Sequence, residues 1–415
     1  MTDRFQQDEE KLRRARIARR RAQMRREKER QRRLRRKLKA CASLLAGGVC
    51  VVVLIFAMKA ILPKAPQTSA REKENTSLQK EAQQAENTQQ DLQETTQSKQ
   101  QEDAENPPVE TVSTGIVNVD DTAGEAVPSS GLKNEKVMVG DKEFWAGYEA
   151  ETTADTTAIY NEEVASTYGI LINASTGEIV ANRDSTTRIN PASMTKILTV
   201  LVAAEQIQDL DEEVTITFEM TDYAYVNDCS VAGFEVDEKV PLKDLFYGTI
   251  LPSGGEAAMA LAIHTAGSQE AFMELMNKKL EELGLADTAH FTNCVGLYDA
   301  NHYCTTYDMA MILKAALEND FCREVLTSRT YQTSVTEEHE EGLLLSNWFL
   351  RRIEDKDCGG EVLGAKTGYV NESGSCAASY GVAASGTPYI CVTANANSSW
   401  RCIYDHVAIY STYGK

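Results

Sequence analysis

The sequence predicts an α/β fold of the α+β kind, in which an antiparallel sheet carries flanking helices and an inserted helical cluster. Two apolar runs around a tight turn open the folded part, and helical periodicity dominates its middle. Three further apolar runs and a helix close the chain. This order places the first and last strands in one sheet, with the helices inserted between them.

The first strands are expected at Tyr168–Asn173 and Gly177–Ala181, two apolar runs separated by a short polar turn. Such a pair of runs indicates a β-hairpin. Met194–Gln206 follows with helical periodicity, and Pro191 and Ser193 suit the first turn of a helix there.

Four more helices are expected in the middle of the chain. Their ranges are Leu242–Ile250, Gly255–Ala266, Glu270–Leu283 and Thr306–Asn319. The amphipathic third helix of this group is followed by Gly284, a residue type that often ends helices.

The last third changes to strand-like patterns. Strands are expected at Gly360–Lys366, Ser375–Ala383 and Pro388–Asn395, with Ser385-Gly386 as the turn of a hairpin. Ser399–Tyr413 is expected as the closing helix.

Residues 1–39 form a strongly basic tail. Residues 1–40 hold 18 Lys/Arg and 6 Asp/Glu, although the whole chain has a net charge of −19. Such an asymmetry indicates a tail that faces an anionic partner, either nucleic acid or the inner membrane surface. Aromatic residues that would stack on bases are nearly absent from it, so no nucleic-acid partner is expected.

The segment that follows the basic tail indicates that its anionic partner is the membrane. Ala40–Met58 contains 19 residues without a charge, which as a helix rising about 1.5 Å per residue spans a bilayer core. Lys59 can extend to the headgroups. A cleaved signal peptide is the alternative, but the basic lead is long and no small-x-small site follows Met58. We therefore expect a transmembrane helix over 40–62 in the cell membrane, with the N-terminus cytoplasmic and the bulk of the chain extracytoplasmic.

Residues 63–143 are rich in Gln, Glu and Thr and poor in aromatics. This composition cannot bury a core, so a disordered tether is expected. A spacer that extends into the cell wall and a plain linker fit equally well. The folded domain is expected over 144–415, beginning near Phe144.

The cysteines give no sign of a metal site. No CxxC pair or His/Cys cluster has the spacing of zinc ligands, so we expect neither a metal nor another cofactor. Eight of the ten cysteines follow the apolar segment, and an even number in an exported domain permits disulfides. Cys294 and Cys304 bracket a short loop and are the first expected pair.

Three short strings carry the chemistry. Ser193-Met-Thr-Lys196 places a hydroxyl and an amine on one helix face, because side chains at i and i+3 are neighbours. Lysine can remove the serine proton only if burial or a nearby positive charge lowers its pKa. A helix N-terminus at Ser193 would also favour developing negative charge. The alternative is a helix cap beside an exposed lysine.

The second and third strings are Ser253-Gly-Gly255 and Lys366-Thr-Gly368. The Ser253 hydroxyl in its tight loop suits proton relay, although by itself it also fits a plain helix cap. Lys366 and Thr367 at a strand end can bind a carboxylate, and Lys366 supplies a second cation near Lys196. Gly368 lets a ligand backbone approach the strand. The three strings in this order indicate an acylating serine hydrolase with a lysine base.

From about Tyr168 to Tyr413 the chain resembles the D-alanyl-D-alanine carboxypeptidases, the low-molecular-weight penicillin-binding proteins of serine peptidase family S11. The resemblance extends beyond the three strings to their surroundings. These are 173–178 (NASTGE), 191–197 (PASMTKI), 296–302 (GLYDANH), 306–310 (TYDMA) and 364–369 (GAKTGY). Agreement over so long a stretch is far more specific than any single motif.

The resemblance implies the fold of β-lactamases and transpeptidases, with a peptidoglycan stem peptide ending in D-Ala-D-Ala as substrate and β-lactams as covalent inhibitors. Ser193 would form the acyl-enzyme, Lys196 would act as base and Ser253 would assist proton transfer. Lys366 and Thr367 would hold the terminal carboxylate. The backbone N–H groups of Ser193 and Tyr369 would form the oxyanion hole.

One position departs from the family pattern, which usually has Ser-x-Asn where this chain has Gly255. The asparagine amide normally bonds substrate and lysine, and loss of such a contact costs about 1–3 kcal/mol. Gly255 therefore motivates an alternative, a pseudoenzyme that binds stem peptide or a cell-wall partner, whereas intact Ser193, Lys196 and Lys366 favour an active enzyme. A β-lactamase ranks last because no Glu-x-x-Leu-Asn string is present. A transpeptidase or endopeptidase stays open.

Overall fold

A six-stranded sheet forms the base of the fold in the computed structural model, which describes residues 135–160 and 162–415. The spatial order is β10-β11-β12-β4-β5-β3. All neighbouring strands are antiparallel except β3 and β5, which are parallel. The strands are β3 (Glu151–Ala158), β4 (Tyr168–Asn173), β5 (Glu178–Arg183), β10 (Gly360–Val370), β11 (Gly374–Ala383) and β12 (Pro388–Ala396). The predicted sheet, built from early and late strands, is confirmed.

Both predicted hairpins are present. The β4–β5 turn closes where the Gly177 N–H donates to the Asn173 carbonyl at 2.9 Å, and Gly177 has a φ of +76° that favours glycine. Ser385-Gly386 forms the turn between β11 and β12. Strand β10 runs on to Val370, past the predicted end at Lys366, so the whole third string lies within a strand.

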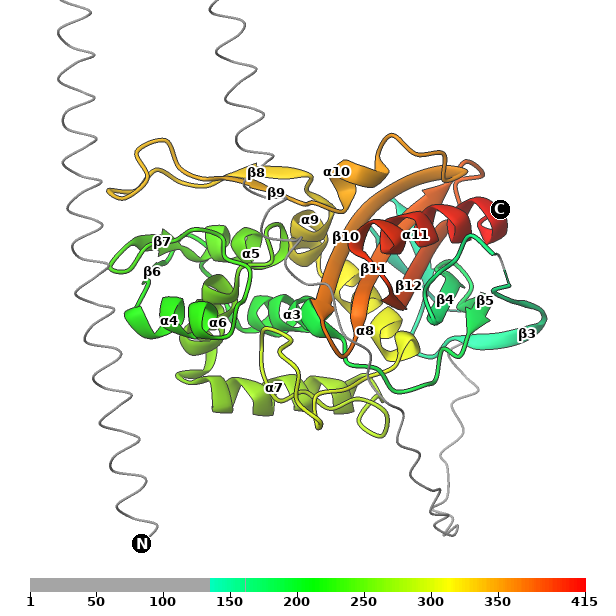
Figure 1. Ribbon diagram of the computed structural model, residues 1–415, viewed down its shortest axis with the longest axis horizontal. Helices are drawn as coiled ribbons and strands as arrows, with labels where there is room; N and C mark the ends of the chain where they lie inside the picture. The colour runs from blue at the N-terminus through cyan, green and yellow to red at the C-terminus, as the bar shows by residue number, and fades with distance from the viewer. Residues whose placement is uncertain (1–134, 161) are drawn as a thin grey trace, which may run out of the picture. The chain divides into compact units, whose positions relative to one another are not determined.

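Alternate residues of β4 enter two separate cores, because successive side chains of a strand point to opposite faces. Ile170 and Ile172 join the core that contains α8 (Thr306–Glu318). Leu171 joins the core that contains α11 (Ser399–Tyr413). The sheet is therefore covered on both faces, and Figure 1 shows α11 lying across it.

The predicted helical cluster is inserted between β5 and β10, and it lies to one side of the sheet in Figure 1. Its central helix, α3 (Lys196–Gln206), is buried from Lys196 to Ala203 and packs against α5, α6, α7 and α8. The other members are α4 (Phe218–Val226), α5 (Leu242–Ile250), α6 (Gly255–Ala266), α7 (Gln269–Glu282) and α9 (Asp320–Thr327). The bounds of α5, α6 and α11 match the predicted ranges.

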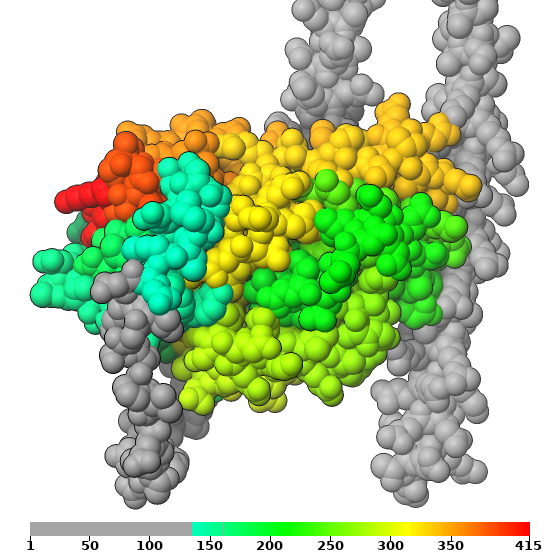
Figure 2. All heavy atoms as spheres, turned by 180° about the vertical axis from the view of Figure 1, so that it is seen from behind, coloured from blue at the N-terminus to red at the C-terminus, as the bar shows by residue number. Residues whose placement is uncertain are grey.

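A hairpin of β1 (Lys136–Val139) and β2 (Lys142–Trp145) begins before the predicted start of the folded domain at Phe144. Its first residues were assigned to the tether, and that boundary was wrong. Phe144 and Trp145 are buried, and the ammonium of Lys314 in α8 lies 4.5 Å from the centre of the Trp145 ring. In Figure 2 the cyan residues of this segment adjoin yellow residues from the α8–α9 region. Burial of these aromatic rings gives the short hairpin its stability.

Several other elements were not predicted. They are β3, α4, α9, β6 (Glu213–Thr215), β7 (Lys239–Pro241), β8 (Thr330–Gln332), β9 (Leu344–Ser346) and α10 (Leu350–Ile353). Most are too short for a periodic signal, and β3 is largely exposed and polar, so it lacks the apolar alternation that marks a strand.

The expected disulfide between Cys294 and Cys304 is wrong, since all eight cysteines of the described part are free thiols. The two side chains have different surroundings. The thiol of Cys294 contacts Met259 and Gln269, whereas Cys304 lies near Asp308 and Cys376. A short separation along the chain does not bring two thiols face to face.

The predicted basic tail over 1–39, the transmembrane helix over 40–62 and the tether as far as residue 134 lie outside the described residues. Among the helices that are described, none is both long and apolar enough to cross a membrane.

Replacing Trp145 by alanine tests the anchoring of the N-terminal hairpin. We expect the free energy of unfolding to fall by about 3–5 kcal/mol, because a buried indole leaves a cavity. Chemical denaturation measures the loss. The matched control is Trp400→Ala, since Trp400 is 46% exposed and its loss should cost clearly less. Equal effects of the two substitutions would contradict this account of the hairpin.

Candidate active site

Ser193 lies in a single 3₁₀ turn, Ala192–Thr195, and Lys196 is the first residue of α3. The predicted helix is therefore present, but it begins with a tighter turn than an α-helix. Ala192 has a φ of +47°, which is uncommon for a residue with a side chain. The polypeptide is thus bent sharply where the serine is presented.

The Lys196 ammonium donates to the Ser193 hydroxyl oxygen, with Nζ 3.0 Å from Oγ. It also donates to the carbonyl oxygen of Val295 at 2.8 Å. Lys196 is 1% exposed, whereas Ser193 is partly accessible. The predicted pairing of hydroxyl and amine is present, and these contacts fix the lysine beneath the serine.

The loop that carries Val295 is held by Asn293, whose side-chain oxygen accepts from the N–H groups of Gly296 and Leu297 at 2.7 and 2.9 Å. Gly296 has a φ of +88°, and a Cβ there would lie 1.9 Å from the carbonyl oxygen of Ala192. Val295 has no chemical signature in the sequence, because it acts through its backbone. The string 296–302 pointed to this loop only through the family resemblance.

The second and third strings meet at one hydrogen bond. Lys366 Nζ donates to the Ser253 hydroxyl at 2.8 Å and to the carbonyl of its neighbour Thr367 at 2.8 Å. Lys366 is 2% exposed, while Ser253 and Thr367 are partly accessible. Ser253 has a φ of +65°, so its loop is also in a sparsely populated conformation.

Strand β10 lies directly against the 3₁₀ turn. A Cβ on Gly368 would lie 2.9 Å from both the Pro191 carbonyl oxygen and the Ser193 backbone nitrogen. Only glycine permits this approach. The backbone of the third string therefore lies beside that of the first. Tyr369 follows on the strand with its ring 63% exposed and its hydroxyl donating to Asn371.

Burial controls the charges of the two lysines. Burial lowers the pKa of Lys196 to about 8, against the influence of nearby Cys229, Cys294 and Glu256. Burial also lowers the pKa of Lys366 well below its usual range, and the positive charge of Lys196 lowers it further. The sequence assigned Lys366 as a cation near Lys196. In the structure, the charge of Lys196 adds to the lowering of the Lys366 pKa, whereas the pKa of Lys196 is lowered by burial alone.

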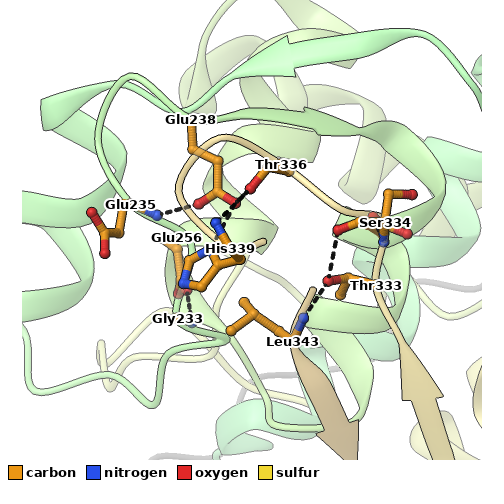
Figure 3. Close-up of polar contacts among 10 residues, drawn as sticks. Gly233, Glu235, Glu238, Glu256, Thr333, Ser334, Thr336, His339 and Leu343 are labelled. Atoms are coloured by element: carbon orange, nitrogen blue, oxygen red, sulfur yellow. Dashed lines mark hydrogen bonds and ion pairs between the residues drawn. The ribbon is translucent and has the colours of Figure 1, made fainter. Parts of the chain in front are cut away.

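Gly255 is the first residue of α6 and is buried. Its N–H donates to the Ser230 carbonyl at 2.8 Å, so its backbone is already engaged. The next residue, Glu256, is 1% exposed and accepts from the N–H groups of Ala232 and Gly233 at 2.6 and 2.9 Å. Figure 3 shows Glu256 beside Gly233, together with a separate polar cluster of Glu238, Thr336 and His339.

His302 connects the serine turn to the neighbouring loop but carries no charge. Its ring contacts the Thr195 hydroxyl at 2.8 Å and accepts from the Thr292 N–H at 3.0 Å. Burial lowers the pKa of His302 to about 3, so the ring is neutral at physiological pH. Within the described part of the chain, no group of three His, Cys, Asp or Glu side chains is arranged to hold a metal ion.

The family is decided by residues 152–398, which match the model of the peptidase S11 family, described as D-alanyl-D-alanine carboxypeptidase. The chain belongs to this family. The match covers the serine turn, the Ser253 loop and the strand that carries Lys366, and so it includes all three strings.

Two curated relatives show how far the likeness extends. The chain is 33% identical over 209 residues to the D-alanyl-D-alanine carboxypeptidase DacF of Bacillus subtilis, covering 50% of this chain and 51% of the relative. It is 35% identical over 182 residues to a D-alanyl-D-alanine carboxypeptidase of Streptomyces sp. strain K15, covering 42% and 62%. The chain thus spans about half to three fifths of the length of these relatives.

Solved structures share the fold. The Streptomyces K15 DD-transpeptidase superposes with a TM-score of 0.54 at 28% identity, covering 60% of this chain and 97% of that one. A D-alanyl-D-alanine carboxypeptidase from Mycobacterium tuberculosis has a TM-score of 0.53 at 23% identity, covering 60% of this chain and 90% of that one, and it supports the fold alone. The predicted β-lactamase/transpeptidase-like fold is confirmed.

Gly296→Ala tests how closely the Val295 loop packs on the serine turn. Gly386 supplies a matched control, because its φ of +89° is nearly the same but a Cβ there would meet nothing within 4 Å. We expect Gly386→Ala to cost on the order of 1 kcal/mol, for the backbone conformation alone. Gly296→Ala should lower the thermal midpoint far more, and similar midpoints would contradict the close packing.

Proposed function

We propose that this protein is a membrane-anchored serine-type D-Ala-D-Ala carboxypeptidase that removes the terminal D-Ala from peptidoglycan stem peptides through an acyl-enzyme. The observation that carries the proposal is a pair of hydrogen bonds, Lys196–Ser193 and Lys366–Ser253. In each of them a buried amine donates to a partly accessible hydroxyl. Family membership supplies the substrate class. The geometry supports the order of the chemical steps.

In the acylation step, neutral Lys196 accepts the Ser193 proton as Oγ attacks the carbonyl carbon of the penultimate D-Ala. The backbone N–H groups of Ser193 and Tyr369 stabilise the negative charge that develops on the carbonyl oxygen. Close packing of Gly368 on the Ser193 backbone supports this role, because it holds strand and turn together.

The leaving D-Ala needs a proton on its amine, and Ser253 is placed to deliver one. Its hydroxyl accepts from Lys366, so a proton can pass from Lys366 through this group to the departing nitrogen. The C–N bond breaks as the amine is protonated. Water then attacks the ester carbonyl, Ser193 regains its proton, and the shortened stem peptide leaves.

The substrate carboxylate is assigned to Lys366 and Thr367. Burial, and after it the positive charge of Lys196, lowers the pKa of Lys366 well below its usual range. A carboxylate at Thr367 would favour the charged form of Lys366. Binding would therefore keep the proton on Lys366 and leave Lys196 as the neutral base.

The pseudoenzyme that binds stem peptide or a cell-wall partner is the second candidate, motivated by Gly255. Intact contacts at Ser193, Lys196, Ser253 and Lys366 support the enzyme instead, since a binding protein does not need paired buried amines. A transpeptidase on the same fold would use the same acyl-enzyme with an amine acceptor in place of water.

We propose the cell membrane as the location, with residues 40–62 spanning the bilayer and the catalytic domain extracytoplasmic. The uncharged run from Ala40 to Met58 behind a basic tail supports this placement. Fractionation of cells that express the full chain tests it. Recovery in the membrane pellet is expected, and recovery in the soluble fraction would argue against an anchor.

Labelling by a fluorescent penicillin tests the acyl-enzyme. We expect the full chain to be labelled covalently and Ser193→Ala to lose all labelling, because the nucleophile is gone. Ser385→Ala, an exposed serine in the β11–β12 turn, is the control that should label normally. Absence of labelling in the wild type at any concentration would support the pseudoenzyme.

The pH dependence of labelling tests the role of Lys196. A general base acts in its neutral form, so the acylation rate should rise with pH and level off above a midpoint near 8. Lys196→Met should reduce the rate by about 10²–10⁴-fold. Stopped-time labelling between pH 6 and 10 measures the profile. A rate that falls over this range would refute a neutral lysine base.

A further inference from the structure

The third position of the second string, Gly255, has no side chain, and a residue from another segment occupies the space beside it. A Cβ built on Gly255 would lie 2.8 Å from the Cβ and 3.3 Å from the Sγ of Cys229. Cys229 follows α4 and lies 26 positions before Gly255 in the sequence. The small residue and the bulkier one are thus complementary in space.

The segment that carries Cys229 is fastened to the start of α6. The Gly255 N–H donates to the Ser230 carbonyl, and the Cys229 N–H donates to the Ala224 carbonyl, each at 2.8 Å. Glu256 accepts from Ala232 and Gly233. Four hydrogen bonds thus engage backbone groups of residues 229–233, two of them with the Glu256 side chain. The fold therefore determines the position of the Cys229 thiol.

The Cys229 thiol also lies within electrostatic range of Lys196. The two groups influence one another electrostatically, and both feel the carboxylate of Glu256. The second oxygen of Glu256 is buried and has no hydrogen-bond partner within the described residues.

Cys229 is also distinguished by its accessibility. The other seven cysteines in the described part are buried, while Cys229 is partly exposed. Ser193 and Ser253 are partly exposed as well, with their lysines buried beneath them. A thiol reagent in solution would therefore reach Cys229 before any other cysteine of the described part.

We propose that Cys229 takes the place of the side chain missing at Gly255: it is a positioning residue that forms the wall of the active site beside Lys196, and modification of its thiol blocks acylation of Ser193. This inference rests on the proposed function. A neutral thiol is a weak donor and acceptor, so this wall would guide the penultimate residue of the peptide chiefly by shape.

A swap of the two side chains tests the complementarity. In Gly255→Asn alone, the amide collides with Cys229, and labelling by fluorescent penicillin should fall at least about tenfold, because the overpacked side chains displace this wall of the site. In the double variant Cys229→Gly/Gly255→Asn the space is open, and labelling should recover to near the wild-type rate. Thermal unfolding of each variant shows whether it is folded.

Two outcomes of the swap would overturn the proposal. One is a single variant Gly255→Asn that labels as fast as the wild type. The other is a folded double variant that is no faster than Gly255→Asn. If the single variant does not fold but the double variant folds and labels, the steric complementarity is supported.

Thiol modification gives an independent test on the native full chain. Methyl methanethiosulfonate transfers a methylthio group: the Cys229 S–H bond breaks, a Cys229–S–S–CH₃ bond forms, and methanesulfinate leaves with the proton. Treated wild type should lose labelling and regain it with dithiothreitol. Cys229→Ala should label more slowly than the wild type but be insensitive to the reagent, and prior acylation should protect the thiol.

The readouts separate this inference from the function on which it rests. Absence of Ser193-dependent labelling in untreated wild type would refute the proposed function. Normal labelling that survives complete methylthiolation of Cys229, confirmed by mass spectrometry of the peptide, would refute only the role of Cys229. Equal loss of labelling in treated wild type and treated Cys229→Ala would assign the block to another cysteine and refute it too.

Discussion

The arrangement depends on one buried amine, Lys196, held between the Ser193 hydroxyl and the Val295 carbonyl. Burial of an ammonium is costly, and the structure meets that cost with two hydrogen bonds and a lowered pKa. The lysine needs a fully enclosed helix start. Helix α3 provides it, because it is covered on several sides by α5, α6, α7 and α8. The helical cluster thus encloses the Lys196 side chain and keeps it from solvent.

The sheet supplies the second requirement, a rigid edge against which the serine turn is pressed. Strand β10 is paired along its length with β11 and carries Lys366, Thr367 and Gly368 on one continuous stretch. Two close approaches, at Gly368 and Gly296, place the backbone of Ser193 between strand and loop. Three segments far apart in the sequence therefore share one site without a disulfide or metal ion in the described part.

Much of this could be predicted because it follows from periodicity or from residue types with specific chemistry. Helices α5, α6 and α11 and both hairpins were identified from apolar patterns, and the pairing of Ser193 with Lys196 from helical spacing.

Contacts made by backbone atoms could not be foreseen. The Val295 carbonyl has no residue signature, and the 3₁₀ turn depends on tertiary packing. Polar strand β3 and hairpin β1–β2 lack the alternation that marks a strand, and the latter is stabilised by distant α8. The predicted disulfide between Cys294 and Cys304 was wrong because a short separation along the sequence does not determine where two side chains point.

Gly255 changes meaning when the sequence is seen in space. In the sequence, Gly255 is a departure from the Ser-x-Asn pattern of the family, since an asparagine is expected there. In the fold it is a close-packed position against Cys229, at a helix start whose N–H is already bonded. The departure is therefore compatible with an intact pocket, provided that the neighbouring segment supplies the missing wall.

The most direct test of this account is the ionisation of the two lysines in the free protein. NMR titration of side-chain ¹⁵N-labelled lysine, with signals assigned through Lys196→Met and Lys366→Met, would follow each amine separately. The account predicts that Lys196 loses its proton near pH 8 and that Lys366 also titrates far below an ordinary lysine. Titration of both near the ordinary value of about 10.4 would contradict it, because neither amine would then be available as a base at neutral pH.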